Sequence, residues 1–203
     1  MPQLTTDPLI LGLVALLAYV LGSIPFGILI TRALGLGDLR TIGSGNIGAT
    51  NVLRTGNKPA AAATLILDAA KGGIAVLIAR AAVGEDAAQL AGLTAFLGHL
   101  FPIWLRFKGG KGVATFLGIL LALAWPVGLA ACATWAVVAA TTRMSSAAAL
   151  CAAGLSGLWL FVFDHGQMLL LVFILTVLVY IRHAANIARI KAGTEPKIGA
   201  KKA

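Results

Sequence analysis

The composition of this chain of 203 residues is typical of a membrane protein. Hydrophobic residues make up 59% of it, charged residues make up 11%, and the mean hydropathy is +0.94. A water-soluble domain of this length has too little interior to bury so much apolar surface, so that class is excluded. The net charge of +9 does not by itself indicate a nucleic-acid partner, because membrane proteins collect Lys and Arg in their cytoplasmic loops.

The first apolar run, residues 9–33, is long enough to cross a bilayer with some tilt. No basic segment precedes it, so we interpret it as a resident span rather than a signal peptide. The small residues Gly22, Ser23 and Gly27 favour close packing against another helix. Pro25 predicts a bend within the span.

Residues 43–54 form the first unusual polar stretch, with three glycines that allow a tight turn and a close approach to a ligand. We expect Ser44 or Asn46 to cap a helix that places Asn46, Thr50 and Arg54 along one stripe. Backbone N–H groups at such a helix start, together with an arginine, suit a phosphate or a carboxylate. The alternative is a plain polar turn between two helices.

The next two spans are predicted over residues 60–83 and 87–105, with an acidic turn between them. Asp68 and Lys71 are three residues apart and therefore share one helical face. Because either charge alone is costly in hydrocarbon, we expect the two to pair or to line a polar cleft. Whether they form a purely structural ion pair or support a site stays open at this point.

Residues 106–115 are the second unusual stretch, with three glycines around Lys111. A helix that begins near Val113 makes this loop a second candidate anion site. It is not a Walker A motif, because the required spacing is missing. The alternative is a basic loop that follows the positive-inside rule, which explains Arg106 and Lys108 but not the glycines.

The charge distribution decides the topology of the remaining chain. Residues 113–140 are too long for one ordinary span, and Trp125-Pro126 predicts a break. If this region leaves and returns, as two short spans or a re-entrant hairpin, the basic loops all lie on the cytoplasmic side. With spans at 147–163 and 168–181, the expectation is an all-α membrane protein. It has seven membrane segments, with its N-terminus outside and its C-terminus cytoplasmic. Residues 1–193 form one domain, and residues 194–203 a flexible basic tail.

Two further polar groups lie at the predicted inner boundary. Ser145 and Ser146 either belong to a site or merely cap the following helix. His183 and Asn186, three residues apart on one helical face, suit a substrate hydroxyl or phosphate. The alternative for this last segment is a basic helix attracted to anionic lipid, which explains its arginines and lysines better than it explains the His–Asn pair.

Four polar clusters are thus predicted to converge on one membrane face. We expect no metal site, because no set of His, Cys and carboxylate side chains has ligand spacing, and Cys132 and Cys151 lie in apolar runs. A carboxylate acid–base pair is also missing. The pattern predicts a site for more than one anion beside an apolar chain. An anion carrier is the main alternative, although we find no internal repeat. A non-catalytic scaffold is a more distant one.

Three segments resemble the bacterial acyl-phosphate-dependent glycerol-3-phosphate acyltransferases, the PlsY family. They are Gly-Ser-Gly-Asn-Ile-Gly-Ala-Thr-Asn-Val-Leu-Arg at 43–54, Gly-His-Leu-Phe-Pro at 98–102 with Phe-Lys-Gly-Gly-Lys-Gly-Val-Ala-Thr at 107–115, and Arg-His-x-x-Asn-Ile-x-Arg at 182–189 with Gly193 and Glu195. Asp-x-x-Lys-Gly at 68–72 matches as well, so the resemblance covers nearly the whole chain. Near Ser146 the chain departs from the family pattern, with Ala148 and Ala149 where a further serine is expected.

The resemblance implies transfer of a fatty acyl group from acyl phosphate to the 1-hydroxyl of sn-glycerol 3-phosphate, the first step of phospholipid synthesis. The products are lysophosphatidate and inorganic phosphate. It also implies a compact bundle of seven transmembrane helices, a monomer without cofactor in the bacterial inner membrane, whose active site faces the cytosol. Lipid and the two substrates are its implied partners, and no nucleic acid is implied. Matching motif positions predict the catalytic residues Ser44, Lys111, His183 and Asn186. The predicted substrate-binding residues are Asn46, Thr50, Asn51, Arg54, Gly109, Gly110, Gly112, Ser145 and Ser146.

Overall fold

The computed structural model describes residues 5–199, and helices and connecting loops account for all of them, with no strand in that range. The chain divides into two compact units, the first ending at Leu123 and the second beginning at Ala124. Each unit has its own packing and is described by itself.

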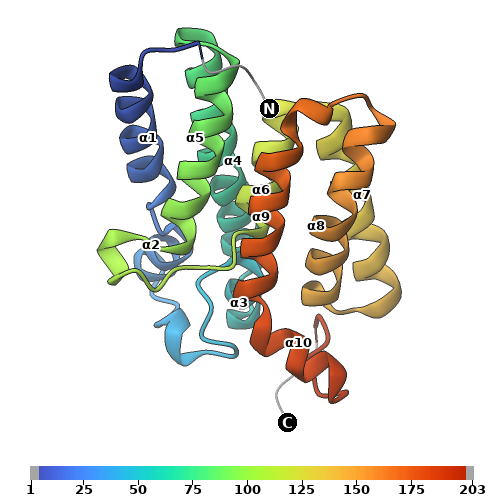
Figure 1. Cartoon of the computed structure of the whole chain (residues 1–203). Coiled ribbons are helices and arrows are strands. Elements are labelled where there is room, and N and C mark those ends of the chain that lie inside the picture. Colours follow the sequence, from blue (N-terminus) through green and yellow to red (C-terminus); the bar gives the residue numbers. More distant parts are fainter. Residues whose placement is uncertain (1–4, 200–203) are drawn as a thin grey trace. The chain divides into compact units, whose positions relative to one another are not determined.

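The first unit is built around three helices that lie side by side, as Figure 1 shows for α1, α4 and α5. Its elements are α1 (Pro8–Gly22), α2 (Phe26–Ala33), the 3₁₀ turn η1 (Leu39–Thr41), α3 (Ala49–Val52), the 3₁₀ turn η2 (Leu53–Thr55), α4 (Lys58–Ala82), α5 (Glu85–Leu100), the 3₁₀ turn η3 (Ile103–Leu105) and α6 (Val113–Leu123).

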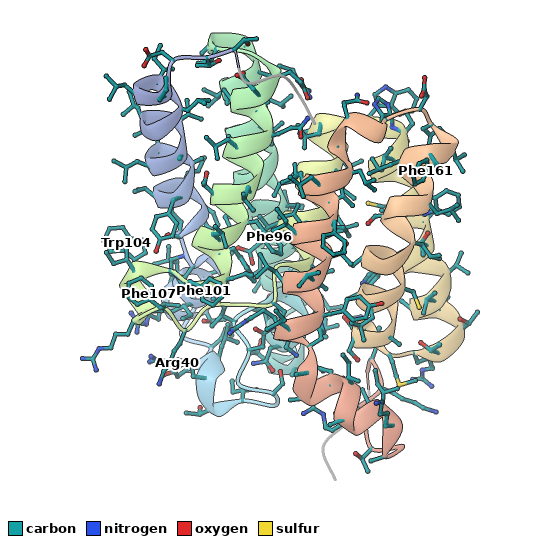
Figure 2. The ribbon with its side chains drawn as sticks, viewed as in Figure 1. Arg40, Phe96, Phe101, Trp104, Phe107 and Phe161 are labelled. Atoms are coloured by element: carbon teal, nitrogen blue, oxygen red, sulfur yellow. The ribbon has the colours of Figure 1, made fainter. Side chains whose placement is uncertain are left out.

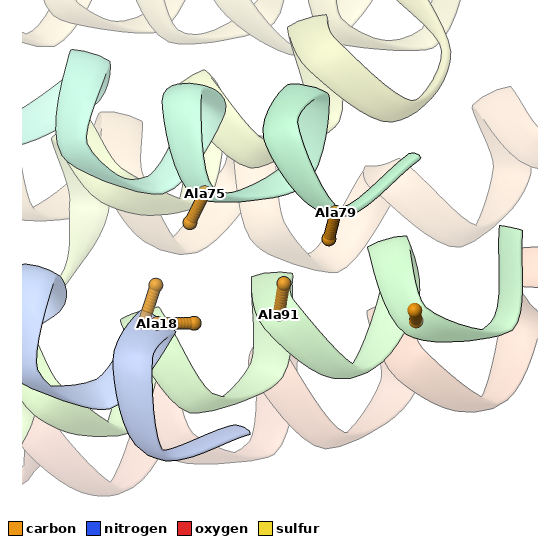
Figure 3. Close-up of a cluster of buried hydrophobic side chains, with 6 residues drawn as sticks. Ala18, Ala75, Ala79 and Ala91 are labelled. Atoms are coloured by element: carbon orange, nitrogen blue, oxygen red, sulfur yellow. The ribbon is translucent and has the colours of Figure 1, made fainter. Parts of the chain in front are cut away.

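Alanine and glycine let these helices pack at backbone distance. Ala18 of α1, Ala75 and Ala79 of α4 and Ala91 of α5 belong to one buried cluster (Figure 3). A methyl group on Gly22 would overlap the backbone carbonyl of Ala95 on α5. Small residues at helix interfaces provide such close contact in membranes, where lipid supplies no hydrophobic drive for helices to associate. The predicted packing role of Gly22 is therefore confirmed.

The predicted bend in the first span is confirmed as a break between α1 and α2. Pro25 precedes α2, where its ring removes a backbone donor. The carbonyl of Ile24, at this break, accepts a hydrogen bond of 2.9 Å from Lys71 Nζ on α4. Lys71 Nζ also lies 2.9 Å from Asp68 Oδ1, so the predicted pairing of these two charges is confirmed.

Arg80, near the end of α4, caps the C-terminus of α6. Its Nη1 donates to the carbonyl of Ala122 at 2.6 Å and its Nη2 to that of Leu123 at 3.0 Å, while its Nε bonds Glu85 at 2.8 Å. The last carbonyls of a helix have no partner within it, and a cation also complements the helix dipole there. This capping role explains a basic residue that stands away from the other basic loops.

The second unit contains α7 (Trp125–Thr142), α8 (Ser145–Val162), the 3₁₀ turn η4 (Gly166–Met168), α9 (Leu169–Arg182) and α10 (Ala184–Lys191). Polar contacts join its helices. Trp159 Nε1 of α8 donates to Thr134 Oγ1 of α7 at 3.1 Å, and the Tyr180 hydroxyl of α9 donates to the carbonyl of Leu150 on α8 at 3.1 Å. The chain bends by 61° between α9 and α10.

The described helices meet the length and composition of membrane spans in five cases, and the bent pair of α9 and α10 makes a sixth. The predicted interruption near Trp125-Pro126 is confirmed, since α6 ends at Leu123 and α7 begins at Trp125 with the proline in its first turn. α6 has only 11 residues, about half the length that a bilayer core requires. The count of seven spans and the orientation of the termini stay predictions.

Candidate functional site

The loop at residues 43–54 is organised by the buried side chain of Asn51. Its Nδ2 lies 2.7 to 3.0 Å from the carbonyls of Leu39, Ile42 and Asn46, and its Oδ1 accepts a bond of 3.1 Å from Arg54 Nη1. Asn51 is 1% exposed, so in this structure it holds the loop in shape and orients the exposed arginine.

Glycine is required within this loop for two reasons. Gly43 and Gly45 both have positive φ, a conformation that costs other residues free energy. A methyl group on Gly43 would also lie 2.5 Å from Arg54 Nη1 and 2.6 Å from Asn51 Oδ1. The loop therefore closes tightly around the arginine that it presents.

The predicted helix in this loop is wrong in its start and length. Gly48 precedes α3, which has only four residues, and no side chain caps it. Asn46 lies before the helix, and Arg54 lies in the 3₁₀ turn η2, so Asn46, Thr50 and Arg54 do not share one helical stripe. The sequence pattern misled because the Asn51 side chain bonds the backbone of the preceding turn, which competes with helix continuation. Ser44 and Thr50 are exposed.

The glycine loop, Gly109–Gly112, is fixed to the end of α5. The N–H of Gly109 donates to the carbonyl of Leu100 at 3.0 Å, and the N–H of Gly110 donates to that of His99 at 3.1 Å. These two amides are thus bonded inside the fold rather than directed at an anion, and the role of the loop as an anion site stays a prediction. The half-buried Lys111 directly follows these two glycines, which are bonded to the end of α5.

Close packing explains the glycines of this loop. A methyl group on Gly112 would overlap the ring of Phe96, which Figure 2 labels, and Gly112 has a φ of +82°. The preceding segment instead turns outward: Trp104 and Phe107 are 61% and 58% exposed, and Figure 2 shows both at the loop that follows α5. Arg106 and Phe107 adopt positive φ in this turn.

The second unit has its own polar cluster, centred on the carboxylate of Glu195. Its Oε1 accepts bonds of 2.6 Å from both Ser146 Oγ on α8 and Asn186 Nδ2 on α10, and its Oε2 pairs with Arg189 Nε at 2.7 Å. Burial acts to raise the pKa of Glu195, but these three hydrogen bonds and the Arg189 charge outweigh it and lower that pKa below its ordinary value of 4.5.

Glu195 had no predicted role beyond its place in the third motif. The one available signal was an acidic residue in an otherwise basic tail. The predicted flexible tail begins at Thr194, yet Glu195 and Ile198 are both held, the latter by a bond of 2.6 Å from its N–H to the carbonyl of Arg143. These bonds attach Glu195 and Ile198 to the rest of the second unit, while the flexibility of residues 194–203 stays a prediction, and residues 200–203 lie outside the described residues.

His183 and Asn186 are both buried at the bend between α9 and α10. His183 Nδ1 lies 2.8 Å from the carbonyl of Val179. Because a carbonyl only accepts, Nδ1 carries the proton, and Nε2 is the basic nitrogen of the neutral ring. Ser145 and Ser146 do not cap α8, since Met144 precedes it and both serines lie in its first turn. The Ser146 hydroxyl instead donates a hydrogen bond to Glu195.

Helices of this length and polarity, with basic glycine-rich loops, define a multi-pass integral membrane protein that presents groups suited to anions. A family model described as glycerol-3-phosphate acyltransferase matches residues 12–193. A glycerol-3-phosphate acyltransferase of Cereibacter sphaeroides is 66% identical over 201 residues, covering 99% of this chain and 96% of the relative. That of Ruegeria pomeroyi is 63% identical over 203 residues and covers both chains completely.

Solved structures agree with these relatives. The crystal structure of PlsY, an integral membrane glycerol 3-phosphate acyltransferase, in its glycerol 3-phosphate form is 38% identical, with a TM-score of 0.88 over 93% of this chain and 96% of that one. Its lysophosphatidic acid form is 37% identical, with a TM-score of 0.87 over 93% and 95%. The chain belongs to the glycerol-3-phosphate acyltransferase family, the PlsY family, and the resemblance seen in its three motifs is confirmed.

Proposed function

We propose that this protein transfers a fatty acyl group from acyl phosphate to the 1-hydroxyl of sn-glycerol 3-phosphate, giving lysophosphatidate and inorganic phosphate. The observation that carries the proposal is the similarity over 93% of the chain to PlsY in a glycerol 3-phosphate form and in a lysophosphatidic acid form. The second compound is the first one with an acyl group added, so the pair corresponds to acceptor and product of one reaction.

Acyl phosphate suits the groups that the chain offers. It is a mixed anhydride, already activated for acyl transfer, so positioning and charge neutralisation supply most of the acceleration. Each substrate also carries a phosphate. The first unit supports one basic residue on each of two tightly closed loops, Arg54 on the loop held by Asn51 and Lys111 on the loop attached to α5. The reaction needs no cofactor.

Within the first unit, we assign the phosphate of glycerol 3-phosphate to Arg54 and Lys111, assisted by Asn46. Asn186, in the second unit, is proposed as a catalytic residue by its motif position. The Gly109–Gly112 loop is assigned to the donor phosphate through groups other than the Gly109 and Gly110 amides, which bond the end of α5. Ser146 is assigned to a substrate by its motif position alone. Arginine and lysine hold phosphate by charge and hydrogen bonding, arginine in two-pronged geometry. The remaining motif residues assigned to the substrates are Ser44, Thr50 and Ser145, while Asn51 acts by holding the arginine loop.

In the reaction the glycerol hydroxyl attacks the acyl carbonyl carbon, an ester bond forms, and the acyl–phosphate bond breaks. The hydroxyl proton passes either to a substrate phosphate or to His183, whose Nε2 is the basic nitrogen. If His183 is the base, replacing it with Ala removes nearly all turnover. Substantial residual turnover in well-folded protein supports the route through the substrate phosphate.

The same proposal extends to the setting. We place the enzyme in the bacterial inner membrane as a monomer of seven spans, with the N-terminus outside and the C-terminus and active site on the cytosolic side. The concentration of Lys and Arg in the predicted inner loops supports this orientation. Labelling of single introduced cysteines in intact cells, with an impermeant reagent, tests it at Gly84 for the outside and Lys197 for the inside.

The deciding experiment is reconstitution of the purified protein in lipid with palmitoyl phosphate and glycerol 3-phosphate. We expect equal amounts of inorganic phosphate and lysophosphatidate, and no product when palmitoyl-CoA replaces palmitoyl phosphate. Lys111→Ala reduces turnover by about a hundredfold or more, because a positioned charge is lost. Lys108→Ala, an exposed lysine of the same loop, is the matched control and keeps wild-type turnover. Uptake of glycerol 3-phosphate into sealed vesicles without any product would indicate a carrier instead.

A further inference from the structure

A buried polar cluster in the first unit has no part in the reaction as described above. Asp68 Oδ1 on α4 lies 2.9 Å from Lys71 Nζ and 3.7 Å from Nδ1 of His99 on α5. The three side chains are at most 4% exposed. Buried charges are tolerated when they are paired, and Asp68 and Lys71 balance one another. His99 is thus an additional polar ring beside a pair that is already neutral.

The other edge of the His99 ring meets the glycine loop. A methyl group on Gly110 would overlap Nε2 of His99, and it would lie 3.0 Å from Cε1 and 3.2 Å from Cδ2 of the same ring. The carbonyl of His99 also accepts the N–H of Gly110 at 3.1 Å. Gly110 therefore rests against the imidazole, and the next residue along the chain is Lys111.

We infer that His99 is a positioning residue for the phosphate loop: its ring, oriented by Asp68, sets the place of Gly110 and through it the place of Lys111. This inference rests on the proposed function, in which the loop and Lys111 hold substrate phosphate. At 4% exposure, His99 does not reach a substrate itself. Its effect comes from geometry, since displacing a charged group by about 1 Å costs up to a hundredfold in rate.

The Gly110 contact allows a test by double-mutant cycle. Gly110→Ala places a methyl group into Nε2 in the wild-type background. His99→Asn keeps an amide nitrogen near the position of Nδ1, facing Asp68, and removes the half of the ring that contacts Gly110. We expect each single variant to raise the KM for glycerol 3-phosphate or for palmitoyl phosphate by about tenfold or more, with a smaller change in kcat.

The double variant distinguishes positioning from a general loss of structure. In the His99→Asn background the added methyl group has room, so Gly110→Ala raises the KM much less than it does in wild type. Multiplicative effects of the two changes would overturn the inference. The matched control is His165→Asn, at the half-buried histidine between α8 and α9 of the second unit, which leaves both KM values unchanged.

Asp68→Asn tests the orienting contact. It preserves the shape of the side chain and removes the charge that faces Nδ1. We expect the KM that rises in His99→Asn to rise here as well, while the elution volume of the protein in detergent stays that of wild type. A normal KM in folded Asp68→Asn protein would remove Asp68 from the inference. If the variant does not fold, the cycle of His99 and Gly110 still decides the role of the ring.

Failure of this inference and failure of the proposed function give different results. If wild-type protein forms no lysophosphatidate, and calorimetry detects no binding of glycerol 3-phosphate, the proposed function fails and the inference fails with it. If wild type is active and the two substitutions show no coupling, only the role of His99 is overturned. Calorimetric Kd values for glycerol 3-phosphate provide a readout that is independent of turnover.

Discussion

The two units bring their polar residues together in different ways. In the first, backbones approach so closely that a methyl group on Gly22, Gly98 or Gly118 would overlap the main chain of a neighbouring helix. In the second, Gly157 has open space around it, and Gly154 faces only the hydroxyl of Tyr180. There the polar residues meet through the carboxylate of Glu195. The polar residues of the first unit are thus positioned by close backbone packing, and those of the second unit by the shared acceptor Glu195.

The largest difference in stability between the two units is expected from glycine substitutions. Gly22→Ala forces α1 away from Ala95 and lowers the free energy of unfolding by about 1–3 kcal/mol or more, because backbone cannot yield as a side chain can. Gly157→Ala, inside α8, raises stability by about 0.5–1 kcal/mol through helix propensity. Thermal unfolding in detergent, followed by loss of monodisperse protein, measures both. Equal sensitivity of the two positions would contradict the contrast between the units.

The second unit is expected to respond to loss of its acceptor. Glu195→Ala leaves Ser146, Asn186 and Arg189 without their shared carboxylate and costs about 1–3 kcal/mol, since hydrogen bonds to charged groups are lost. Turnover falls as Asn186 loses its orientation. Lys197→Ala, an exposed change in the same tail, is the control and has little effect. Wild-type turnover in Glu195→Ala protein would show that the carboxylate does not organise these groups.

A smaller effect is expected where the first unit orients a single side chain. Arg54→Lys keeps the positive charge but loses the bond from Nη1 to Asn51 Oδ1. We expect the KM for glycerol 3-phosphate to rise about three- to tenfold, the value of one hydrogen bond, with folding unchanged. Steady-state kinetics at saturating palmitoyl phosphate measure it. An unchanged KM would mean that charge alone suffices at this position.

Lowering the pH is expected to reduce the stability of the second unit by a small amount. The pKa of Glu195 is lower in the folded protein than its ordinary 4.5, so its carboxylate contributes stability above pH 4.5 that is lost as pH falls through the lowered value. Partial solvent exposure keeps this contribution small. When thermal unfolding is measured from pH 7 down to pH 3, the Tm of wild type should fall more than the Tm of Glu195→Gln. Parallel curves of Tm against pH for the two proteins would contradict a stabilising role of the Glu195 carboxylate.

The sequence by itself determined the class of the protein and much of its local chemistry. Hydropathy predicts apolar helices, Pro25 predicts the break after α1, and the spacing of Asp68 and Lys71 predicts their ion pair, because each depends on residues a few positions apart. The motifs also identified the family. They were long enough to specify a resemblance without any knowledge of packing.

Only the tertiary structure decided which groups satisfy one another. The hydroxyl of Ser146 meets Glu195 across 49 positions of sequence, and Arg80 caps a helix end 42 and 43 residues away. Asn51 bonds carbonyls in the preceding turn, so a stretch with helical spacing closes as a loop. A donor has many acceptors available along an unfolded chain. Burial then removes water as the competing partner and leaves the acceptor that packing brings within reach.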